Sequence, residues 1–284
     1  MQLYTDYFAD HLFAAVLIVA VFSLLVGSFL NVVIHRLPIM MQRQWDSEIT
    51  GEPPVETYNL AKPDSQCPHC QHVIKWYENI PLFSYLFLLR GKCASCKAPI
   101  SIRYPMIELL SALLSIPIVI SFGFNYLTLL ALFFTWVLIA LTFIDLDHFL
   151  LPDKLTLPLL WLGLLINSQD TFTSLESAVY GAAAGYLSLW SVYWLFKLAT
   201  GKEGMGYGDF KLLAALGAWM GLSALPIIIL ISSISGIVIA LTLALFNKQA
   251  LDQPIPFGPY LTIAGFVSLL WGAQITQIYL NLVL

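Results

Sequence analysis

The sequence predicts an all-α polytopic membrane protein with about eight transmembrane helices and a small cytoplasmic zinc-ribbon-like insert. The first observation is composition. Of the 284 residues, 59% are hydrophobic and 11% are charged, whereas an ordinary soluble domain carries about 25% charged residues. The mean hydropathy of +0.80 agrees with this. The other two observations are a series of long apolar runs and one polar segment that holds every cysteine.

The apolar runs locate the expected spans, because a bilayer core needs roughly 20 apolar residues per helix. Two of the runs are short, so we expect these helices to be tilted, buried by their neighbours, or to begin below the membrane surface. The first run is not expected to be a cleaved signal peptide, since it is too long and no Lys or Arg precedes it. The runs are 12–34, 105–122, 127–144, 155–168, 177–199, 211–224, 226–246 and 258–282.

The basic residues predict the orientation, because Lys and Arg accumulate in cytoplasmic loops. Eight of the thirteen lie between Arg36 and Arg103. If this segment is cytoplasmic and the chain crosses about eight times, every later Lys, from Lys154 to Lys248, is also cytoplasmic. Both termini are then periplasmic. The net charge of -4 gives no basic surface for nucleic acid, and no nucleic-acid partner is expected.

Three parts of the chain are expected: a first transmembrane helix (1–35), a cytoplasmic zinc-binding insert (36–104) and a membrane domain (105–284). Within the insert, residues 41–66 read as an irregular polar loop. The apolar stretch in ENIPLFSYLFLLRGK (78–92) is too short to cross a membrane. We expect it to be a helix packed against the zinc ribbon or the membrane surface. An insert of this size gains stability from a bound metal.

Four cysteines form two C-x-x-C pairs in the insert, in the sequences CPHC and CASC. This spacing is typical of a structural zinc ribbon, because each pair supplies two thiolates from one tight turn to a tetrahedral ion. A cytoplasmic location disfavours disulfides. The alternative is a pair of redox dithiols, but no thioredoxin-like context is present. His69 and His72 are expected to be bystanders. The expected zinc ligands are Cys67, Cys70, Cys93 and Cys96.

Asp145 and Asp209 are the expected catalytic pair. Charged residues at membrane depth are rare and usually functional. Asp145 ends the third span and Asp209 begins the sixth, so both are expected at the cytoplasmic edge. Two facing carboxyl groups cannot both ionise cheaply, so one keeps a proton while the other accepts one from water. Such a pair can hydrolyse an amide without a covalent intermediate. The alternatives are a proton relay in a transporter, or a polar contact between helices.

Glycines and further carboxylates surround this pair in the sequence. Gly204, Gly206 and Gly208 are expected to allow unusual backbone angles beside Asp209 and to leave room for an extended substrate. Asp153 follows a proline and precedes an apolar run, which indicates a helix N-cap. Asp147, two residues past Asp145, is an interfacial residue, an assistant or a substrate contact.

Glu108 lies early in the second span, where a carboxylate suits a helix N-terminus. Motifs for a competing site are absent from the sequence. It has no nucleophile elbow, no H-E-x-x-H, no P-loop and no dinucleotide fingerprint.

These motifs resemble a known family. GMGYGD (204–209) fits the G-x-G-D pattern of membrane aspartyl proteases. Together with FIDLDHFLLPD (143–153), it resembles the bacterial type IV prepilin leader peptidase/N-methyltransferases. The resemblance covers nearly the whole chain. It extends to GSFLNVVIHRLP (27–38), CPHC (67–70), ENIPLFSYL (78–86), RGKCASC (90–96), ISIRYPMIELL (100–110), LPDKLTLPLLWLGLL (151–165) and PFGPYL (256–261).

The resemblance implies an enzyme of the inner membrane with two activities. Such enzymes cleave the basic leader of type IV prepilins and type II secretion pseudopilins at the cytoplasmic face. They then methylate the new N-terminal amine, commonly of Phe, with S-adenosylmethionine. The family's catalytic aspartates match Asp145 and Asp209, and its zinc ligands match the four cysteines. The methyltransferase is expected in the insert and the neighbouring segment 27–38, and its cofactor contacts are unknown.

Two alternatives to this implied function remain open at this point. One is a proton-coupled transporter that uses Asp145 and Asp209 as a relay. The other is a family member with only the peptidase or only the methyltransferase activity.

Overall fold

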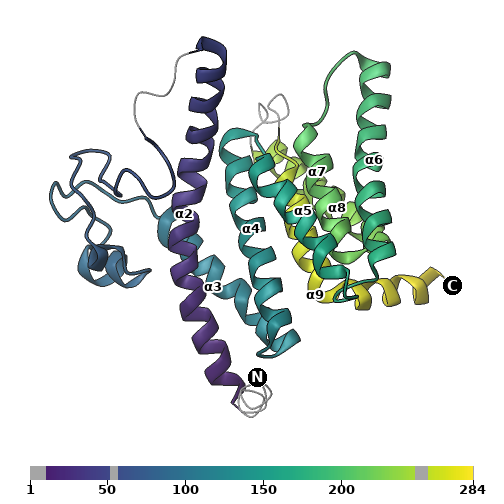
Figure 1. Ribbon diagram of the computed structural model, residues 1–284, viewed down its shortest axis with the longest axis horizontal. Helices are drawn as coiled ribbons and strands as arrows, with labels where there is room; N and C mark the ends of the chain where they lie inside the picture. The colour runs from purple at the N-terminus through teal and green to yellow at the C-terminus, as the bar shows by residue number, and fades with distance from the viewer. Residues whose placement is uncertain (1–10, 52–56, 247–254, 284) are drawn as a thin grey trace. The chain divides into compact units, whose positions relative to one another are not determined.

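The computed structural model of the protein describes residues 11–51, 57–246 and 255–283 (Figure 1). These residues are helical or irregular, apart from two isolated antiparallel bridges, which confirms the predicted fold class. Lys248, which is expected in the cytoplasm, lies outside the described residues. The α-helices are α2 (Leu12–Thr50), α3 (Arg103–Phe122), α4 (Tyr126–His148), α5 (Asp153–Asn167), α6 (Leu175–Thr200), α7 (Tyr207–Met220), α8 (Leu225–Phe246) and α9 (Gly258–Val283).

Five of the described helices are long and apolar enough to cross a membrane, namely α2, α3, α4, α8 and α9. Helices α5 and α7 have 15 and 14 residues, and they coincide with the two short apolar runs of the sequence. The chain divides into two compact units, Met1–Ala140 and Leu141–Leu284, and each is described by itself below.

In the first unit, α2 and α3 pack closely as an antiparallel pair. Asn31 on α2 donates to the carbonyl oxygen of Tyr104 on α3 over 3.1 Å. Ser111 on α3 donates to the carbonyl oxygen of Ser23 over 2.8 Å. Between these bonds, a Cβ atom on Gly27 would lie 2.7 Å from a Cα atom of α3. The two backbones can therefore approach this closely only because a glycine stands at the crossing.

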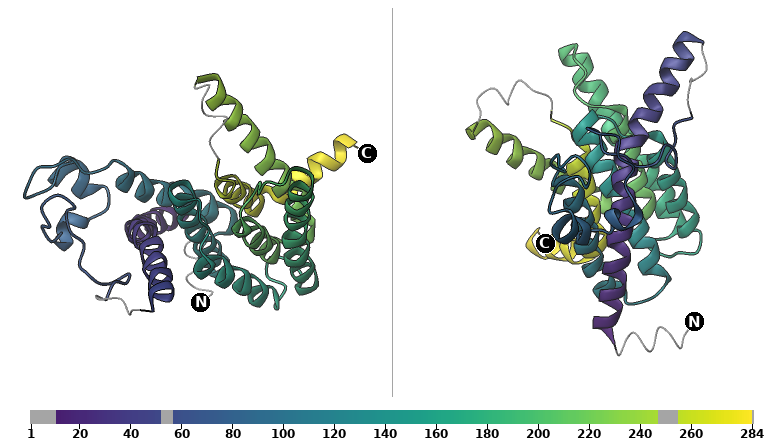
Figure 2. Two further views of the ribbon diagram at one scale, coloured as in Figure 1. Left: turned by 90° about the horizontal axis from the view of Figure 1, so that it is seen from above. Right: turned by 90° about the vertical axis from the view of Figure 1, so that its left-hand side faces the viewer.

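Helix α2 continues beyond its predicted span and ends at Thr50. The prediction of an irregular loop over 41–66 is therefore wrong for its first part. Hydrogen bonds one helical turn apart support this polar extension, as between Gln42 and Asp46 (3.0 Å). Gly51 ends the helix in the left-handed conformation with φ of 72°. The right view of Figure 2 shows α2 as one continuous helix.

In the second unit, α7 is an interior helix. It contacts α5, α6, α8 and α9, and these helices lie together in Figure 1. Every side chain from Asp209 to Trp219 is buried except that of Lys211. A helix that is apolar all round is stable when other helices cover it. The structure thus confirms, for this short run, that neighbouring helices bury it.

Glycines and two buried side chains fix the position of α7. A Cβ atom on Gly181 of α6 would lie 2.5 Å from the carbonyl oxygen of Gly217, so α6 and α7 are in backbone contact. The indole nitrogen of Trp219 donates to the carbonyl oxygen of Leu159 on α5 over 2.8 Å. Asn167 donates to the last turn of α7 over 2.8 Å. These contacts define where the first turn of α7 lies.

Candidate functional site

Asp145 lies in the last turn of α4, and its side chain is buried, with 5% of the residue exposed. Its Oδ2 atom accepts a hydrogen bond of 2.9 Å from the backbone N–H of Gly258, the first residue of α9. A carboxylate is favourable at a helix N-terminus, because the N–H groups there have no partner within the helix. A Cβ atom on Gly258 would lie 2.5 Å from Oδ2, so the contact requires glycine.

Asp209 lies in the first turn of α7 and is 7% exposed. Its Oδ1 atom is buried and has no hydrogen-bond partner among the described residues. A buried polar atom without a partner is costly in a folded protein, and each one calls for an explanation. Such an oxygen is suited to bind a water molecule or a substrate group.

The structure brings the two expected catalytic residues together. Both lie in the second unit, and the carboxyl groups are close enough to interact electrostatically. Leu151, in the connection between α4 and α5, packs against Gly208, the residue before Asp209, and against Gly258, the hydrogen-bond partner of Asp145. A Cβ atom on Gly208 would lie 2.7 Å from Leu151 Cβ, and one on Gly258 would lie 3.1 Å from Leu151 Cδ2. The roles of Leu151 and Gly258 are not apparent from the sequence, in which they belong to the segments LPDKLTLPLLWLGLL (151–165) and PFGPYL (256–261).

The glycine-rich segment before α7 differs from its expected role. Gly204, Gly206 and Gly208 do not have positive φ angles, so unusual backbone angles do not explain them. Close packing explains why glycine is needed at two of the three positions. A Cβ atom on Gly204 would lie 2.8 Å from the ring of Phe196, and Gly208 faces Leu151 as described. Gly206 is less crowded, since the nearest contact of an added Cβ atom would be Asp209 Oδ2 at 3.6 Å, an ordinary van der Waals distance.

An ion pair at the end of α6 holds the same segment. Lys197 lies 2.8 Å from Glu203, which is in the loop between α6 and α7. The hydrogen bond from Lys197 lowers the pKa of Glu203. The ring of Tyr193 also packs against that of Tyr207, with centroids 5.3 Å apart. The chain is therefore tied to α6 on both sides of Gly204 and Gly206.

The predicted N-cap role of Asp153 is wrong. Pro152 occupies the N-cap position of α5 and makes no side-chain cap. Asp153 instead accepts two hydrogen bonds from the ammonium group of Lys211 on α7, over 2.7 and 2.8 Å. The sequence gives no signal for this pair, because its members belong to different helices. The pair joins the first turns of α5 and α7.

The remaining carboxylates lie apart from this arrangement. Asp147 is exposed, two residues beyond Asp145. Glu108 is buried in the first unit, where its Oε2 atom accepts the backbone N–H of Leu82 over 2.9 Å. Glu108 therefore supports the cysteine-rich insert, which the sequence did not indicate.

The two C-x-x-C pairs form turns with the same hydrogen bonds. In each turn the N–H of the first cysteine donates to the residue five positions later, from Cys67 to His72 (2.9 Å) and from Cys93 to Ala98 (2.8 Å). A bridge closes each turn, between Gln66 and Val73 and between Lys92 and Pro99. Each turn also has one residue with positive φ in the same place, and these residues are Gln71 and Lys97.

The sulfur atoms of the four cysteines have the geometry of a metal site. All four lie within 4.8 Å of one another. The separation is 3.8 Å between Cys67 and Cys96 and 3.9 Å between Cys70 and Cys93. A tetrahedral zinc ion with Zn–S bonds of about 2.3 Å requires sulfur atoms about 3.8 Å apart. Backbone N–H groups of Cys96 and Ser95 lower the pKa of the Cys93 thiol to about 6, which favours the thiolate that metals bind. At Cys96 the backbone N–H of Ala98 acts in the same direction, but hydrogen bonding with the other three cysteines, together with burial, outweighs it and raises the pKa of that thiol.

The histidines have positions that agree with a bystander role. His69 is exposed. His72 lies 3.2 Å from Glu78 Oε2, so its ring already has a partner. The backbone N–H of Lys75 lowers the pKa of Glu78, which keeps this carboxylate ionised beside the ring.

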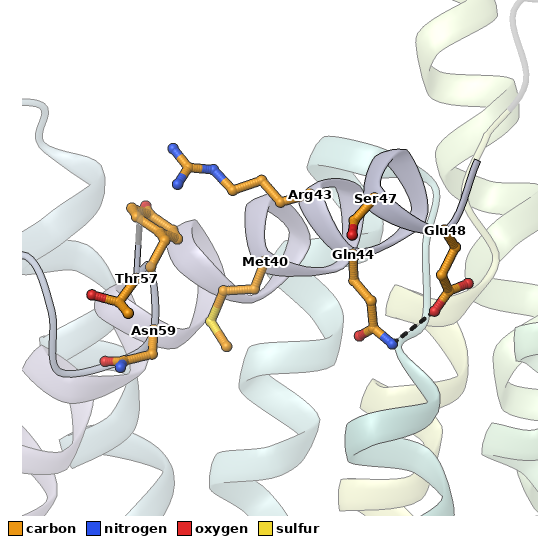
Figure 3. A pocket seen from close by; sticks show the side chains of 8 residues that line it. Met40, Arg43, Gln44, Ser47, Glu48, Thr57 and Asn59 are labelled. Atoms are coloured by element: carbon orange, nitrogen blue, oxygen red, sulfur yellow. Dashed lines mark hydrogen bonds between the residues drawn. The ribbon is translucent and has the colours of Figure 1, made fainter. Parts of the chain in front are cut away.

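A groove of about 560 Å³ lies along the polar extension of α2 (Figure 3). Its lining mixes opposite charges with an aromatic ring. The guanidinium of Arg43 lies 4.3 Å from the ring centroid of Tyr58, and Glu48 accepts a hydrogen bond of 3.0 Å from Gln44. The lining residues are Met40, Arg43, Gln44, Ser47, Glu48, Thr57, Tyr58 and Asn59.

Two family models match the chain. A model of the Bacterial Peptidase A24 N-terminal domain matches residues 21–122. A model of the Type IV leader peptidase family matches residues 132–241. The first range contains the four cysteines, and the second contains Asp145 and Asp209.

Several proteins are similar to the chain over nearly its whole length. A protein of Aeromonas hydrophila named Prepilin leader peptidase/N-methyltransferase is 59% identical over 274 residues, which cover 93% of each chain. Proteins with the same name from Stutzerimonas stutzeri and Pseudomonas aeruginosa are 58% and 56% identical, each over 97% of both chains. No solved structure matches the chain.

The geometry of the cysteines predicts the metal content of the protein. Cys67→Ser should abolish binding of a single zinc ion per chain, because three thiolates leave the tetrahedral shell incomplete. His69→Ala, the matched control, should keep the ion. Elemental analysis of the purified proteins measures both. A parent protein that carries no zinc and keeps its insert resistant to protease would contradict this prediction.

Proposed function

This chain belongs to the type IV leader peptidase family, and from that premise we propose that it cleaves prepilin leaders with the Asp145–Asp209 pair and then methylates the new N-terminus. The observation that supports the peptidase assignment is a pair of buried carboxyl groups close enough to interact electrostatically, one of which has an oxygen without a partner among the described residues. The proposed substrates are type IV prepilins and type II secretion pseudopilins.

In the proposed mechanism, the two carboxyl groups share one proton and activate a water molecule between them. We assign the ionised role to Asp145, whose Oδ2 already accepts the N–H of Gly258. Asp145 takes a proton from the attacking water. Asp209 is assigned the protonated role, and its acid proton polarises the scissile carbonyl group. The tetrahedral intermediate then collapses as Asp145 returns its proton to the leaving amine.

A prepilin fits this site chemically. Its cut site lies between a polar, basic leader and an apolar helix, so the bond should be cut at a membrane–water boundary. Asp145 is at the end of α4 and Asp209 at the start of α7. We therefore place the site at the cytoplasmic face of the inner membrane, with both termini in the periplasm. The buried Oδ1 atom of Asp209, which has no partner among the described residues, is available to a group of the bound peptide.

The second reaction uses S-adenosylmethionine, which supplies a methyl group bound to a positively charged sulfur. We assign this activity to the insert (36–104) and the peptidase to residues 105–284. The groove along α2 has side chains that suit the cofactor. Arg43 suits its carboxylate, Glu48 its ribose hydroxyls or its positive charge, and Tyr58 offers an aromatic edge. We place the methyl donor there, and zinc at the four cysteines as a structural ion.

A proton-coupled transporter is less well supported. A relay needs ionisable groups spaced across the membrane. The two buried carboxylates of the second unit are instead close together. The buried Glu108 is engaged by a backbone N–H in the first unit.

Asp145→Asn and Asp209→Asn should each reduce prepilin cleavage by about 10²–10⁴-fold, because each removes one partner of the proton exchange. The measurement is the mass of the product after purified full-length protein is incubated with prepilin, with and without S-adenosylmethionine. Cleavage alone, cleavage with methylation, and no reaction give different masses. Asp147→Asn is the control for an exposed carboxylate. Normal cleavage by either catalytic variant would show that the pair is wrongly assigned.

Gly258→Ala should reduce cleavage by about 10²-fold, because the added methyl group displaces the Asp145 carboxylate. Gly272→Ala is a matched control on the same helix, where the nearest atom to the new Cβ would be 3.7 Å away. Turnover should fall for Gly258→Ala, while thermal stability in detergent stays near that of the parent. Equal activity of the two variants would argue against this contact.

Arg43→Ala should raise the concentration of S-adenosylmethionine needed for methylation and leave cleavage unchanged, because the groove is assigned only to the second reaction. Lys75→Ala is the control, since it removes a cation that lies 5.9 Å from the ring of Tyr77, outside the groove. The assay follows both products by mass over a range of cofactor concentrations. An unchanged requirement for cofactor would remove the groove from consideration, with the peptidase assignment unaffected.

A further inference from the structure

A short helical turn between the two cysteine pairs exposes large apolar side chains. We call residues 82–88 the apolar turn. Its exposed members are Phe83 (48%), Leu86 (57%), Phe87 (67%) and Leu88 (52%). The rings of Phe83 and Phe87 are 5.2 Å apart, so they form one surface. Water-soluble proteins seldom expose adjacent side chains of this size without a partner.

The opposite side of the apolar turn is polar and occupied. Ser84 is 2% exposed, and its hydroxyl donates to the carbonyl oxygen of Tyr77 over 2.6 Å. The same hydroxyl accepts the N–H of Ile80 over 3.1 Å. The turn therefore directs its polar group inward and its apolar groups outward, the reverse of what an aqueous environment favours.

A hydrogen bond joins the start of the apolar turn to a residue within a predicted span. The N–H of Leu82 donates to Glu108 on α3 over 2.9 Å. Glu108 packs against Gly27 of α2, where a Cβ atom would lie 2.7 Å from its Cα. The predicted first span ends at residue 34, so Gly27 lies about seven residues, or roughly 10 Å, inside that end. The backbone of Leu82, where the apolar turn begins, is thus bonded to a residue that packs against the predicted first span.

A second face of α3 is also apolar. The exposed side chains of Ile102 (71%), which immediately precedes α3, and of Met106 (50%), Leu109 (43%) and Leu113 (52%) follow one helical face. Glu108 is on the other side, toward α2. Two exposed basic residues, Arg90 and Lys92, follow the apolar turn directly. Apolar side chains beside basic ones are typical of segments that lie in the interface of an anionic membrane.

We propose that the apolar turn is embedded in the cytoplasmic leaflet of the bilayer and anchors the zinc-binding insert to the membrane. The occupant of this surface is lipid, because the turn is bonded to Glu108 within a predicted span, its apolar side chains are exposed and two basic residues follow it. Arg90 and Lys92 lie at the headgroups. The insert is then a monotopic element held at the membrane by its own side chains, and this holds whether or not the proposed reactions are correct.

The experiment places a photoreactive side chain on this surface in the full-length protein. The variant Phe87→p-benzoylphenylalanine is reconstituted in vesicles of phosphatidylethanolamine and phosphatidylglycerol and illuminated. Mass spectrometry is expected to find lipid attached to the insert. The control is Ile49→p-benzoylphenylalanine. Ile49 is 83% exposed on the polar extension of α2, beyond the predicted span. No lipid adducts are expected at this position.

The result that overturns the proposal is an equal yield of lipid adducts at positions 87 and 49, or none at position 87. If position 87 crosslinks to added prepilin instead of lipid, the surface belongs to the substrate, and this result would also overturn the proposal. Zinc content shows whether each variant has folded. Phe83→p-benzoylphenylalanine, on the same surface, gives an independent reading if the first variant loses zinc. None of these outcomes depends on cleavage or methylation.

Discussion

The hydrogen bond from Gly258 N–H to Asp145 Oδ2 joins the end of α4 to the start of α9, and the arrangement of the site depends on it. A buried carboxylate without such a partner would be costly. The bond is possible only because no Cβ atom stands in its way. Leu151 fills the space between Gly258 and Gly208, so the same contacts that hold Asp145 also set the approach of Asp209. The geometry of the proposed catalytic pair therefore depends on these close backbone contacts.

Helix α7 carries the second carboxylate, that of Asp209. Its packing explains how so short a helix can hold this side chain in place. Its neighbours bury it on all sides, so its length need not match the thickness of a bilayer. The backbone contact of Gly181 with Gly217 holds it against α6. Trp219 and Asn167 bind its last turn from α5. A helix held so firmly at one end presents its first turn at a defined place, which a dyad requires of Asp209.

The first unit uses a different principle, because its insert has little apolar interior. Two turns with the same hydrogen bonds bring four sulfur atoms to within 4.8 Å of one another, and a metal would stabilise both turns at once. Glu108 links this insert to the membrane helices through Leu82. A carboxylate that reads as part of a helix N-terminus in the sequence is thus a connection between the insert and α3. If the apolar turn lies in lipid, the bilayer supplies the cover that the insert lacks.

The sequence by itself determined the helical fold class, the places of the helices and the two cysteine pairs. It could do so because hydropathy, basic residues and the C-x-x-C spacing are local properties of the chain. Asp145 and Asp209 could be singled out for the same reason, as carboxylates at the ends of apolar runs. Only the tertiary structure decided that Asp153 binds Lys211, that Gly258 supports Asp145 and that Gly204 and Gly208 provide space rather than unusual angles. These are contacts between distant segments, and no local pattern encodes them, because each depends on how closely two helices pack.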